Sequence, residues 1–327
     1  MQIKNEIWIL ADQRVGTYSQ SIGLAQELGI DYKIITLAYS FFSSLPNFFL
    51  SNSLLRISKT SKQEINSLNY LPKIIISAGR RTAPIALALK KQNPQQIKTI
   101  QIMNPNLNFS KFDFVILPKH DGIDEKKFSN LITTIGSLTK IDQATITKAG
   151  EKFPQLKEIT KTKIALLIGG NSKKTNFDKD SAIDLAKIST RIANNMNAKL
   201  LVLTSRRTGA KLTKIILNNL DCDYEIFDWL KLDNANPYLA IINSADFFIV
   251  SGDSVSMISE CASTSKPLYI FDQKKISTKK HRIFHQDLFN ENYAKKLEEN
   301  LEILKNFSPK KLQETKRIAS IIKNKIA

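Results

Sequence analysis

The segment DSVSMISE (253–260) has the residue types and spacing of an anion-binding helix start. A capping side-chain oxygen, free backbone N–H groups and two hydroxyls would meet at the positive end of the helix. The glutamate follows the second of these serines by four residues, so it lies one turn later on the same face. There a carboxylate can accept bonds from both hydroxyls of a ribose. The pattern predicts a nucleoside-diphosphate site; the alternative is a capped helix with a surface glutamate. The candidate residues are Asp253, Ser254, Val255, Ser256 and Glu260.

A second loop, LLIGGNS (166–172), places two glycines directly after an apolar run. Because glycine has no side chain, Gly169 and Gly170 let the backbone approach a phosphate closely. Asn171 follows them with a polar side chain. This loop is predicted to belong to the same phosphate site, and the alternative is a tight turn without a ligand.

Two motifs, SAGRRT (77–82) and TSRRT (204–208), repeat one pattern, since each follows an apolar run and precedes a helical one. The chain has 39 Lys and only 9 Arg, yet four of the nine lie in these two pairs. Where composition favours Lys so strongly, a retained Arg points to its planar fork, which binds carboxylate or phosphate through two bonds. We expect anion binding here; the alternative is an interdomain salt bridge or helix packing. The residues concerned are Ser205, Arg206, Arg207, Arg80 and Arg81.

His120 and Asp121 end the run FDFVILPKHD (112–121). A histidine can act as a general base near neutral pH when a carboxylate orients it. Adjacent residues of an extended chain point to opposite faces, however, so the sequence also allows a structural role in a cleft wall. In the first loop of the chain, Gly16 stands between a strand pattern and a helix that we expect to open at Gln20.

An apolar, aromatic cluster surrounds Pro46. It is either a buried loop of the first domain or an exposed patch that touches a membrane or a lipid acceptor. The tail, residues 273–327, holds 14 Lys or Arg and 6 Asp or Glu, and a basic tail of this kind is attracted to an anionic bilayer. The apolar residues are Phe41, Phe42, Leu45, Phe48, Phe49 and Leu50.

The elements that must position these residues alternate regularly between strand and helix. Near-continuous apolar runs bounded by turn residues are typical of parallel strands buried on both faces. The predicted strands are 6–12, 32–39, 73–79, 97–103, 112–118, 163–170, 198–205, 224–230, 246–252 and 267–273. The predicted helices are 19–29, 83–92, 178–197, 210–220, 237–245, 254–264, 291–305 and 309–326.

The alternation is interrupted by a polar stretch and then resumes, which predicts two doubly wound α/β domains of the Rossmann-like kind. We place the first domain at 1–145, a linker at 146–162 and the second domain at 163–310. A C-terminal helix at 311–327 could cross back onto the first domain. Ligands of such sheets lie beyond the carboxyl ends of the strands. We therefore expect the two domains to face each other across a cleft, with Gly16, Gln20, Arg80, Arg81 and Asp121 on the wall opposite the nucleotide.

Composition excludes several classes of protein. With 327 residues, 42% hydrophobic and 24% charged, the chain is too apolar for a mainly disordered protein and long enough for two domains. Two cysteines cannot build a disulfide framework or a structural zinc site. No apolar run reaches the length of a membrane span, and the N-terminus is not typical of a signal peptide. We therefore expect a cytoplasmic protein.

The net charge of +18 first suggests nucleic acid as a partner. Because the chain also has 43 Ile and a large excess of Lys over Arg, much of this charge follows from a composition typical of an AT-rich genome. An anionic surface or a solvated face explains the charge equally well. The chain shows no aromatic–basic module, so nucleic acid ranks last among the partners considered.

The chain resembles the elongated-mitochondria family, which comprises the plant mitochondrial fission factor and bacterial, mostly alphaproteobacterial, relatives. The motifs keep their order over most of the chain, and the second half is also similar to the nucleotide-sugar half of GT-B glycosyltransferases. Ser265 stands where this family usually has glycine, so a left-handed turn there would cost about 1 kcal/mol. The motifs are 77–84 (SAGRRTAP), 104–121 (NPNLNFSKFDFVILPKHD), 166–172 (LLIGGNS), 204–209 (TSRRTG), 236–238 (NPY) and 253–260 (DSVSMISE).

The resemblance implies a GT-B-like fold that binds a nucleotide sugar or nucleoside diphosphate. One reading is a glycosyltransferase that acts on a lipid or envelope precursor, without a metal because no Asp-x-Asp pair lies near the site. The other is a non-catalytic adaptor, peripheral at the inner face of a membrane, that recruits a protein partner, as the plant relatives bring a dynamin-related protein to mitochondria. No resident cofactor is implied.

Overall fold

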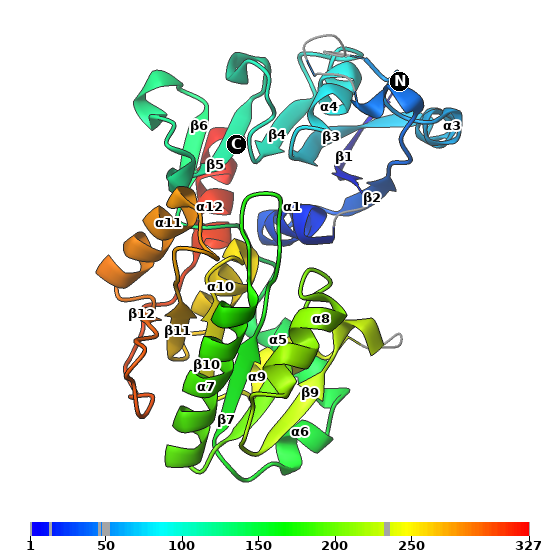
Figure 1. Cartoon of the computed structure of the whole chain (residues 1–327). Helices are drawn as coiled ribbons and strands as arrows, with labels where there is room; N and C mark the ends of the chain where they lie inside the picture. Colours follow the sequence, from blue (N-terminus) through cyan, green and yellow to red (C-terminus); the bar gives the residue numbers. More distant parts are fainter. Residues whose placement is uncertain (1, 13–14, 45–46, 48–52, 232–235, 327) are drawn as a thin grey trace. The chain divides into compact units, whose positions relative to one another are not determined.

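The chain forms two compact α/β units, seen in the computed structural model in Figure 1. The structure describes residues 2–12, 15–44, 47, 53–231 and 236–326. Unit 1 comprises Met1–Lys140 and Gln313–Ala327, and unit 2 comprises Ile141–Leu312.

Unit 1 contains a six-stranded parallel sheet in the order β2-β1-β3-β4-β5-β6. Its strands are β1 (Gln2–Ala11), β2 (Tyr32–Thr36), β3 (Tyr70–Ala78), β4 (Lys98–Ile102), β5 (Phe114–Pro118) and β6 (Leu131–Thr134). Its helices are α1 (Val15–Leu28), α3 (Lys59–Ser67), α4 (Ala83–Lys90) and α12 (Glu314–Ile326), with 3-10 turns at Phe41–Ser44, Phe109–Lys111, Lys119–Asp121 and Glu125–Lys127.

Side chains of the central strands in unit 1 alternate between two hydrophobic cores. Ile9 and Ile76 pack with α1 and α12 on one face. Trp8 and Ile75 pack with α3 and α4 on the other. All four are fully buried, which explains why these strands are apolar throughout rather than at alternate positions.

Unit 2 contains a second six-stranded parallel sheet, in the order β12-β11-β10-β7-β8-β9. Its strands are β7 (Lys163–Leu167), β8 (Lys199–Leu203), β9 (Tyr224–Phe227), β10 (Phe247–Ser251), β11 (Leu268–Phe271) and β12 (Lys295–Lys296). Its helices are α5 (Gln143–Glu151), α6 (Gln155–Glu158), α7 (Lys179–Asn195), α8 (Gly209–Leu217), α9 (Tyr238–Ser244), α10 (Val255–Ala262) and α11 (Lys279–Asn290), with a 3-10 turn at Trp229–Lys231.

The structure differs from the predicted boundaries at both ends of unit 2. Residues 146–162, where the sequence predicts a linker, include most of α5 and all of α6, and both helices pack against α9. Residues 313–327 belong to unit 1, where α12 packs on α1. The first turn of α12 is fixed there because Thr315 Oγ1 accepts from the Thr139 N–H at 2.9 Å and donates to the Thr139 carbonyl at 2.9 Å.

The expected helix at 291–305 is wrong. The helix is α11, twelve residues earlier, and 295–296 form the edge strand β12. Thr278 and His281 form a capping box at the start of α11, and Asn292, with φ of 58°, follows its end. The two histidines of this segment, His281 and His285, therefore lie on a helix. His285 is fully buried, with its Nδ1 3.3 Å from Asp272.

Ser265 has φ of 65°, which confirms that a left-handed conformation is needed where the family usually has glycine.

Candidate functional site

Three loops of unit 2 meet at the carboxyl ends of neighbouring strands. They follow β7, β8 and β10, which pair side by side in the order β10-β7-β8. Parallel strands end at one edge of a sheet, so the predicted motifs at 169–171, 205–208 and 252–256 come together although up to 87 residues separate them in sequence.

Asp253 lies at the centre of this group. Its fully buried carboxylate accepts from the Gly170 N–H at 2.9 Å, from Ser251 Oγ at 2.7 Å and from Arg207 Nη2 at 2.9 Å. Burial raises the pKa of the Asp253 carboxyl above its ordinary value, and the Arg207 charge opposes that rise. The expectation that Asp253 or Ser254 caps α10 with a side-chain oxygen is wrong, because no such bond forms and the aspartate turns back toward Gly170.

The two glycines serve the internal packing of this group. The Gly169 N–H donates to Ser251 Oγ at 2.8 Å, and the Asn171 N–H donates to the Arg207 carbonyl at 3.2 Å. A Cβ on Gly169 would lie 2.2 Å from the Asp253 carboxylate, and one on Gly170 would lie 2.3 Å from backbone atoms of Arg207. The N–H groups of this loop are thus bonded within the protein, and the role of the loop in a phosphate site stays a prediction.

The two arginines of the second loop differ in their surroundings. Arg207, besides its ion pair with Asp253, donates from Nη1 to the Gly170 carbonyl at 3.2 Å. Ser205 Oγ donates to the Gly169 carbonyl and accepts from the Arg207 N–H at 3.2 Å. Arg206 is exposed and forms no ion pair with any described residue. Arg207 therefore fixes the loops of unit 2 to one another, whereas Arg206 is available to a ligand.

The start of α10 presents unbonded donors. In the described part of the chain, the N–H groups of Val255, Ser256 and Met257 have no acceptor, while the Ser254 N–H reaches the Ser251 carbonyl at 3.4 Å. Val255, Ser256 and Met257 are all partly exposed. Unbonded donors at a helix start are suited to an anion, and the anion site at this position stays a prediction.

Glu260 has a partner that the sequence does not reveal. Tyr238, the first residue of α9, donates its hydroxyl to the Glu260 carboxylate. Burial, followed by the negative charge of Glu260, raises the pKa of Tyr238 well above its ordinary value, so the phenol remains a donor. Tyr238 ends the motif NPY, which could have pointed to it, but its contact spans 22 residues.

The predicted residues of unit 1 follow different strands. Gly16 lies in the first turn of α1, so the expectation of a loop up to Gln20 is wrong. Gln20 is buried, and its Nε2 lies 3.9 Å from Met103 Sδ. His120 and Asp121, both half-buried, lie in a 3-10 turn after β5, not on extended chain as the sequence argument assumes.

Arg80 and Arg81 lie in the turn between β3 and α4, where Arg80 is exposed and Arg81 lies over the Tyr39 ring. Of the apolar cluster around Pro46, Phe41 and Phe42 are exposed, which favours the exposed patch for these two residues. Leu45, Pro46, Phe48, Phe49 and Leu50 lie outside the described residues.

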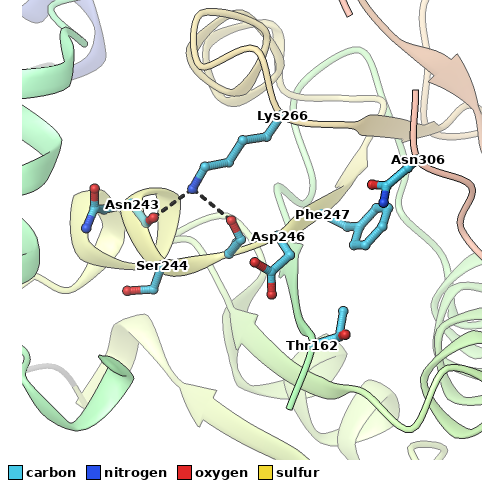
Figure 2. Close-up of a pocket in the computed structure, with 8 residues that line it drawn as sticks. Thr162, Asn243, Ser244, Asp246, Phe247, Lys266 and Asn306 are labelled. Atoms are coloured by element: carbon cyan, nitrogen blue, oxygen red, sulfur yellow. Dashed lines mark hydrogen bonds between the residues drawn. The ribbon is translucent and has the colours of Figure 1, made fainter. Parts of the chain in front are cut away.

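A hollow of about 450 Å³ lies at the opposite, amino-terminal edge of the unit 2 sheet. Figure 2 shows Lys266 reaching from this hollow to the end of α9, where its Nζ donates to the carbonyls of Ile242, Asn243 and Ala245 at 2.6–3.0 Å. Burial lowers the pKa of the Lys266 amine. Because this cation already caps a helix, the hollow is separate from the predicted chemistry. The described residues contain no group of three or more His, Cys, Asp or Glu that could hold a metal, and their helices include none long and apolar enough to cross a membrane.

Comparison with known proteins identifies the family. A family model described as mitochondrial fission ELM1 matches residues 15–326. The chain belongs to the mitochondrial fission ELM1 family. An uncharacterized protein of Rickettsia prowazekii, RP120, is 35% identical over 97% of both chains. The mitochondrial fission protein ELM1 of Arabidopsis thaliana is 27% identical over 61% of this chain and 51% of its own length.

Solved structures show that this ELM1-family protein has a GT-B-like fold. MurG of Acinetobacter baumannii aligns with a TM-score of 0.52 and 11% identity, over 98% of this chain and all of the other. The UDP-GlcNAc 2-epimerase of Methanocaldococcus jannaschii, in complex with UDP-GlcNAc and UDP, aligns with a TM-score of 0.54 and 13% identity. The alignment covers 99% of this chain and 100% of the epimerase chain. The glycosyltransferase SnogD of Streptomyces nogalater aligns with a TM-score of 0.51 and 10% identity, over 91% of this chain and 88% of the SnogD chain. At these identities the likeness concerns the fold alone.

Proposed function

We propose that this ELM1-family protein binds a nucleotide sugar at the start of α10 and transfers the sugar to a lipid or envelope precursor. The observation that carries the proposal is the juxtaposition of three unbonded N–H groups, at Val255, Ser256 and Met257, with Glu260 one helical turn away. Solved structures of the same fold have UDP-GlcNAc and UDP bound, which supports a ligand of this class.

Each part of such a ligand has a chemical match in unit 2. The diphosphate fits the start of α10, where the helix dipole and N–H donors stabilise negative charge by roughly 0.3–2 kcal/mol. Exposed Arg206 adds a cation. The ribose hydroxyls fit Glu260, whose carboxylate Tyr238 orients. Because these groups supply positive charge without a metal, we expect binding to persist when divalent cations are chelated.

Calorimetric titration with UDP, in buffer containing a chelator, tests the ribose assignment. Glu260→Ala is expected to weaken binding about tenfold, equal to about 1.4 kcal/mol. Tyr238→Phe should weaken it less, because it removes only the hydroxyl that orients the carboxylate. The matched control is Glu298→Ala, which changes an exposed glutamate of the same unit. Equal UDP affinity in wild type and Glu260→Ala would remove the ribose from this position.

Transfer also needs a base, for which His120 of unit 1 is the candidate. Release of UDP from UDP-GlcNAc, in the presence of membrane lipid extract, measures turnover. His120→Asn is expected to reduce the rate at least about a hundredfold and to leave UDP affinity unchanged. An unchanged rate would exclude His120 as the base.

The alternative is a binding protein that recruits a partner at a membrane. It is supported by the relative from Arabidopsis thaliana, a mitochondrial fission protein. In that case UDP would bind at α10, but no combination of a nucleotide sugar with an acceptor would lead to release of UDP. The same two assays therefore separate the two functions.

A further inference from the structure

A surface of unit 1, far in sequence from the nucleotide-binding residues, combines exposed apolar side chains with arginines. We name it the arginine–phenylalanine surface. Its members are Phe41, Phe42, Leu55, Arg80 and Arg81.

Backbone pairing holds the two segments of this surface together. The Ser40 N–H donates to the Arg56 carbonyl at 2.8 Å, and Ser40 Oγ donates to the Leu55 carbonyl at 2.5 Å. Tyr39 forms an antiparallel bridge with Ile57. Phe41, which directly follows Ser40, is therefore fixed beside the 55–56 segment.

The apolar part is unusually open to solvent. Phe41 is 93% exposed, Phe42 50% and Leu55 54%. The Phe41 and Phe42 rings contact edge to face, with centroids 6.1 Å apart. Single exposed apolar residues are ordinary, but neighbouring ones mark a surface that is covered when the protein works.

The charged part lies against the same segments. Arg81 lies over the Tyr39 ring, with its Cζ 5.4 Å from the ring centroid. Asn47 donates to the Arg80 carbonyl at 2.7 Å and to the Pro105 carbonyl at 2.6 Å, which fixes the turn that carries both arginines. In the described part of the chain no carboxylate pairs with Arg80 or Arg81.

Arg56, in the segment paired with Ser40, is buried, and burial together with the charges of Arg80 and Arg81 lowers the pKa of its guanidinium. The three guanidinium groups thus create a positive potential at one place, and the segment of Arg56 is hydrogen-bonded to Ser40, which directly precedes the exposed rings. The chain as a whole carries +18, which adds long-range attraction to an anionic surface.

We propose that the arginine–phenylalanine surface docks on an anionic phospholipid bilayer. Phe41 and Phe42 enter the boundary between headgroups and acyl chains, while Arg80 and Arg81 bind lipid phosphates. Aromatic rings beside cations suit this interface because it offers apolar chains and phosphates within a few ångströms. This docking goes beyond the proposed nucleotide site, which lies in unit 2, and holds for either a transferase or an adaptor.

Co-sedimentation of the full chain with vesicles tests the proposal. We expect binding to vesicles of phosphatidylcholine mixed with phosphatidylglycerol, weak binding to phosphatidylcholine alone, and a decrease as salt rises. Phe41→Ser should weaken binding at least about tenfold, from lost burial of the ring. Arg80→Gln should weaken it about fivefold, the equivalent of about 1 kcal/mol. In a Phe41→Trp protein, tryptophan emission should shift to the blue on binding.

Matched controls distinguish vesicle binding by this surface from non-specific attraction by net charge or by other exposed apolar side chains. Ile303→Ser changes an exposed apolar side chain of unit 2, and Lys211→Gln removes an exposed cation there; neither should alter vesicle binding. Because Phe41 and Arg80 are exposed, their variants should melt like wild type. UDP titration of the same variants, without vesicles, should match wild type and so keeps this result separate from the nucleotide proposal.

Three outcomes would overturn the proposal. One is a wild type that ignores anionic vesicles at low salt. Another is equal loss of binding in Lys211→Gln and Arg80→Gln with no effect of Phe41→Ser, which would show attraction by net charge only. The third is complete displacement from vesicles by millimolar inorganic phosphate with no effect of Phe41→Ser, which would identify a site for a small free anion.

Discussion

The two arginine loops of this protein share a buried threonine after the arginine pair but differ in the groups that the threonine and the arginines contact. In unit 1, Thr82 Oγ1 accepts from the Ala78 N–H at 3.0 Å and donates back to the Ala78 carbonyl at 2.9 Å. In unit 2, Thr208 Oγ1 accepts from the Ser205 N–H at 2.9 Å and donates to the Gly169 carbonyl. Each loop thus uses a buried threonine to close the link from a strand to a helix.

The arginines separate the two loops. Arg207 pairs with the buried Asp253 and reaches the Gly170 carbonyl, so it ties three loops of unit 2 together. Arg81 rests on Tyr39 without a carboxylate partner among the described residues. The comparison teaches that the same motif can be structural or available to a ligand, depending on whether an acidic residue elsewhere in the fold reaches it.

Glycine substitutions should produce the largest contrast. Gly170→Ala is expected to lower the free energy of unfolding by about 3–5 kcal/mol, since the new Cβ would lie 2.3 Å from backbone of Arg207 and φ is +138°. Gly79→Ala, at φ of +76° with only Thr17 Cγ2 nearby at 3.8 Å, should cost about 1–2 kcal/mol. Urea unfolding of both variants measures the difference. Equal losses would mean that the loops of unit 2 are not packed as closely as described.

Arginine substitutions test the difference directly. Arg207→Ala should lower the free energy of unfolding by about 3 kcal/mol at neutral pH, because it leaves the Asp253 carboxylate buried without its cation. Arg81→Ala should cost about 0.5–1 kcal/mol, the value of a cation–aromatic contact. A larger loss in Arg81→Ala than in Arg207→Ala would reverse the assignment of roles.

The loss of unfolding free energy in Arg207→Ala should also depend on pH. Burial raises the pKa of Asp253 in the folded state, and removing Arg207 raises it further. The folded variant then binds this proton more tightly than the unfolded chain, so its stability falls as pH rises above about 4 through the raised pKa. Urea unfolding of both proteins across this range should show the deficit of Arg207→Ala growing with pH. A deficit independent of pH would indicate that Asp253 is not the charge left behind.

Substitution of the two threonines should lower the free energy of unfolding by similar amounts in the two loops. Thr208→Val and Thr82→Val each leave one backbone N–H without its hydroxyl acceptor, at a cost of about 1–2 kcal/mol. Thermal unfolding of the two variants beside wild type measures both. A loss confined to one of them would show that only that threonine hydroxyl stabilises its loop.

The sequence predicts the strands well and the partners of polar residues poorly. Periodicity identifies β10 and the helix after it because local spacing alone places Ser256 and Glu260 on one face. It misses the bond from Tyr238 to Glu260 and the ion pair from Arg207 to Asp253, since these join segments 22 and 46 residues apart. The sequence identifies the glycine pair as a place of close approach but does not reveal that Asp253 approaches it, because a ligand and a side chain leave the same signal.

The helix α11 is missed for a related reason. Its residues are basic and contain two histidines, and its buried apolar face consists of only Phe284 and Leu288. Tertiary packing decides the outcome, because His285 and Phe284 are buried and Gly252 allows close approach, with a built Cβ only 2.9 Å from the His285 ring.

The central claim is that a nucleoside diphosphate binds the open N–H groups of α10, and amide chemical shifts measured during a UDP titration test it most directly. We predict large, saturable changes at the amides of Val255, Ser256 and Met257, with smaller ones at Gly169 and Gly170, whose N–H groups are bonded to Ser251 and Asp253. No change at the three α10 amides at saturating UDP, or changes concentrated in another part of the chain, would contradict the account.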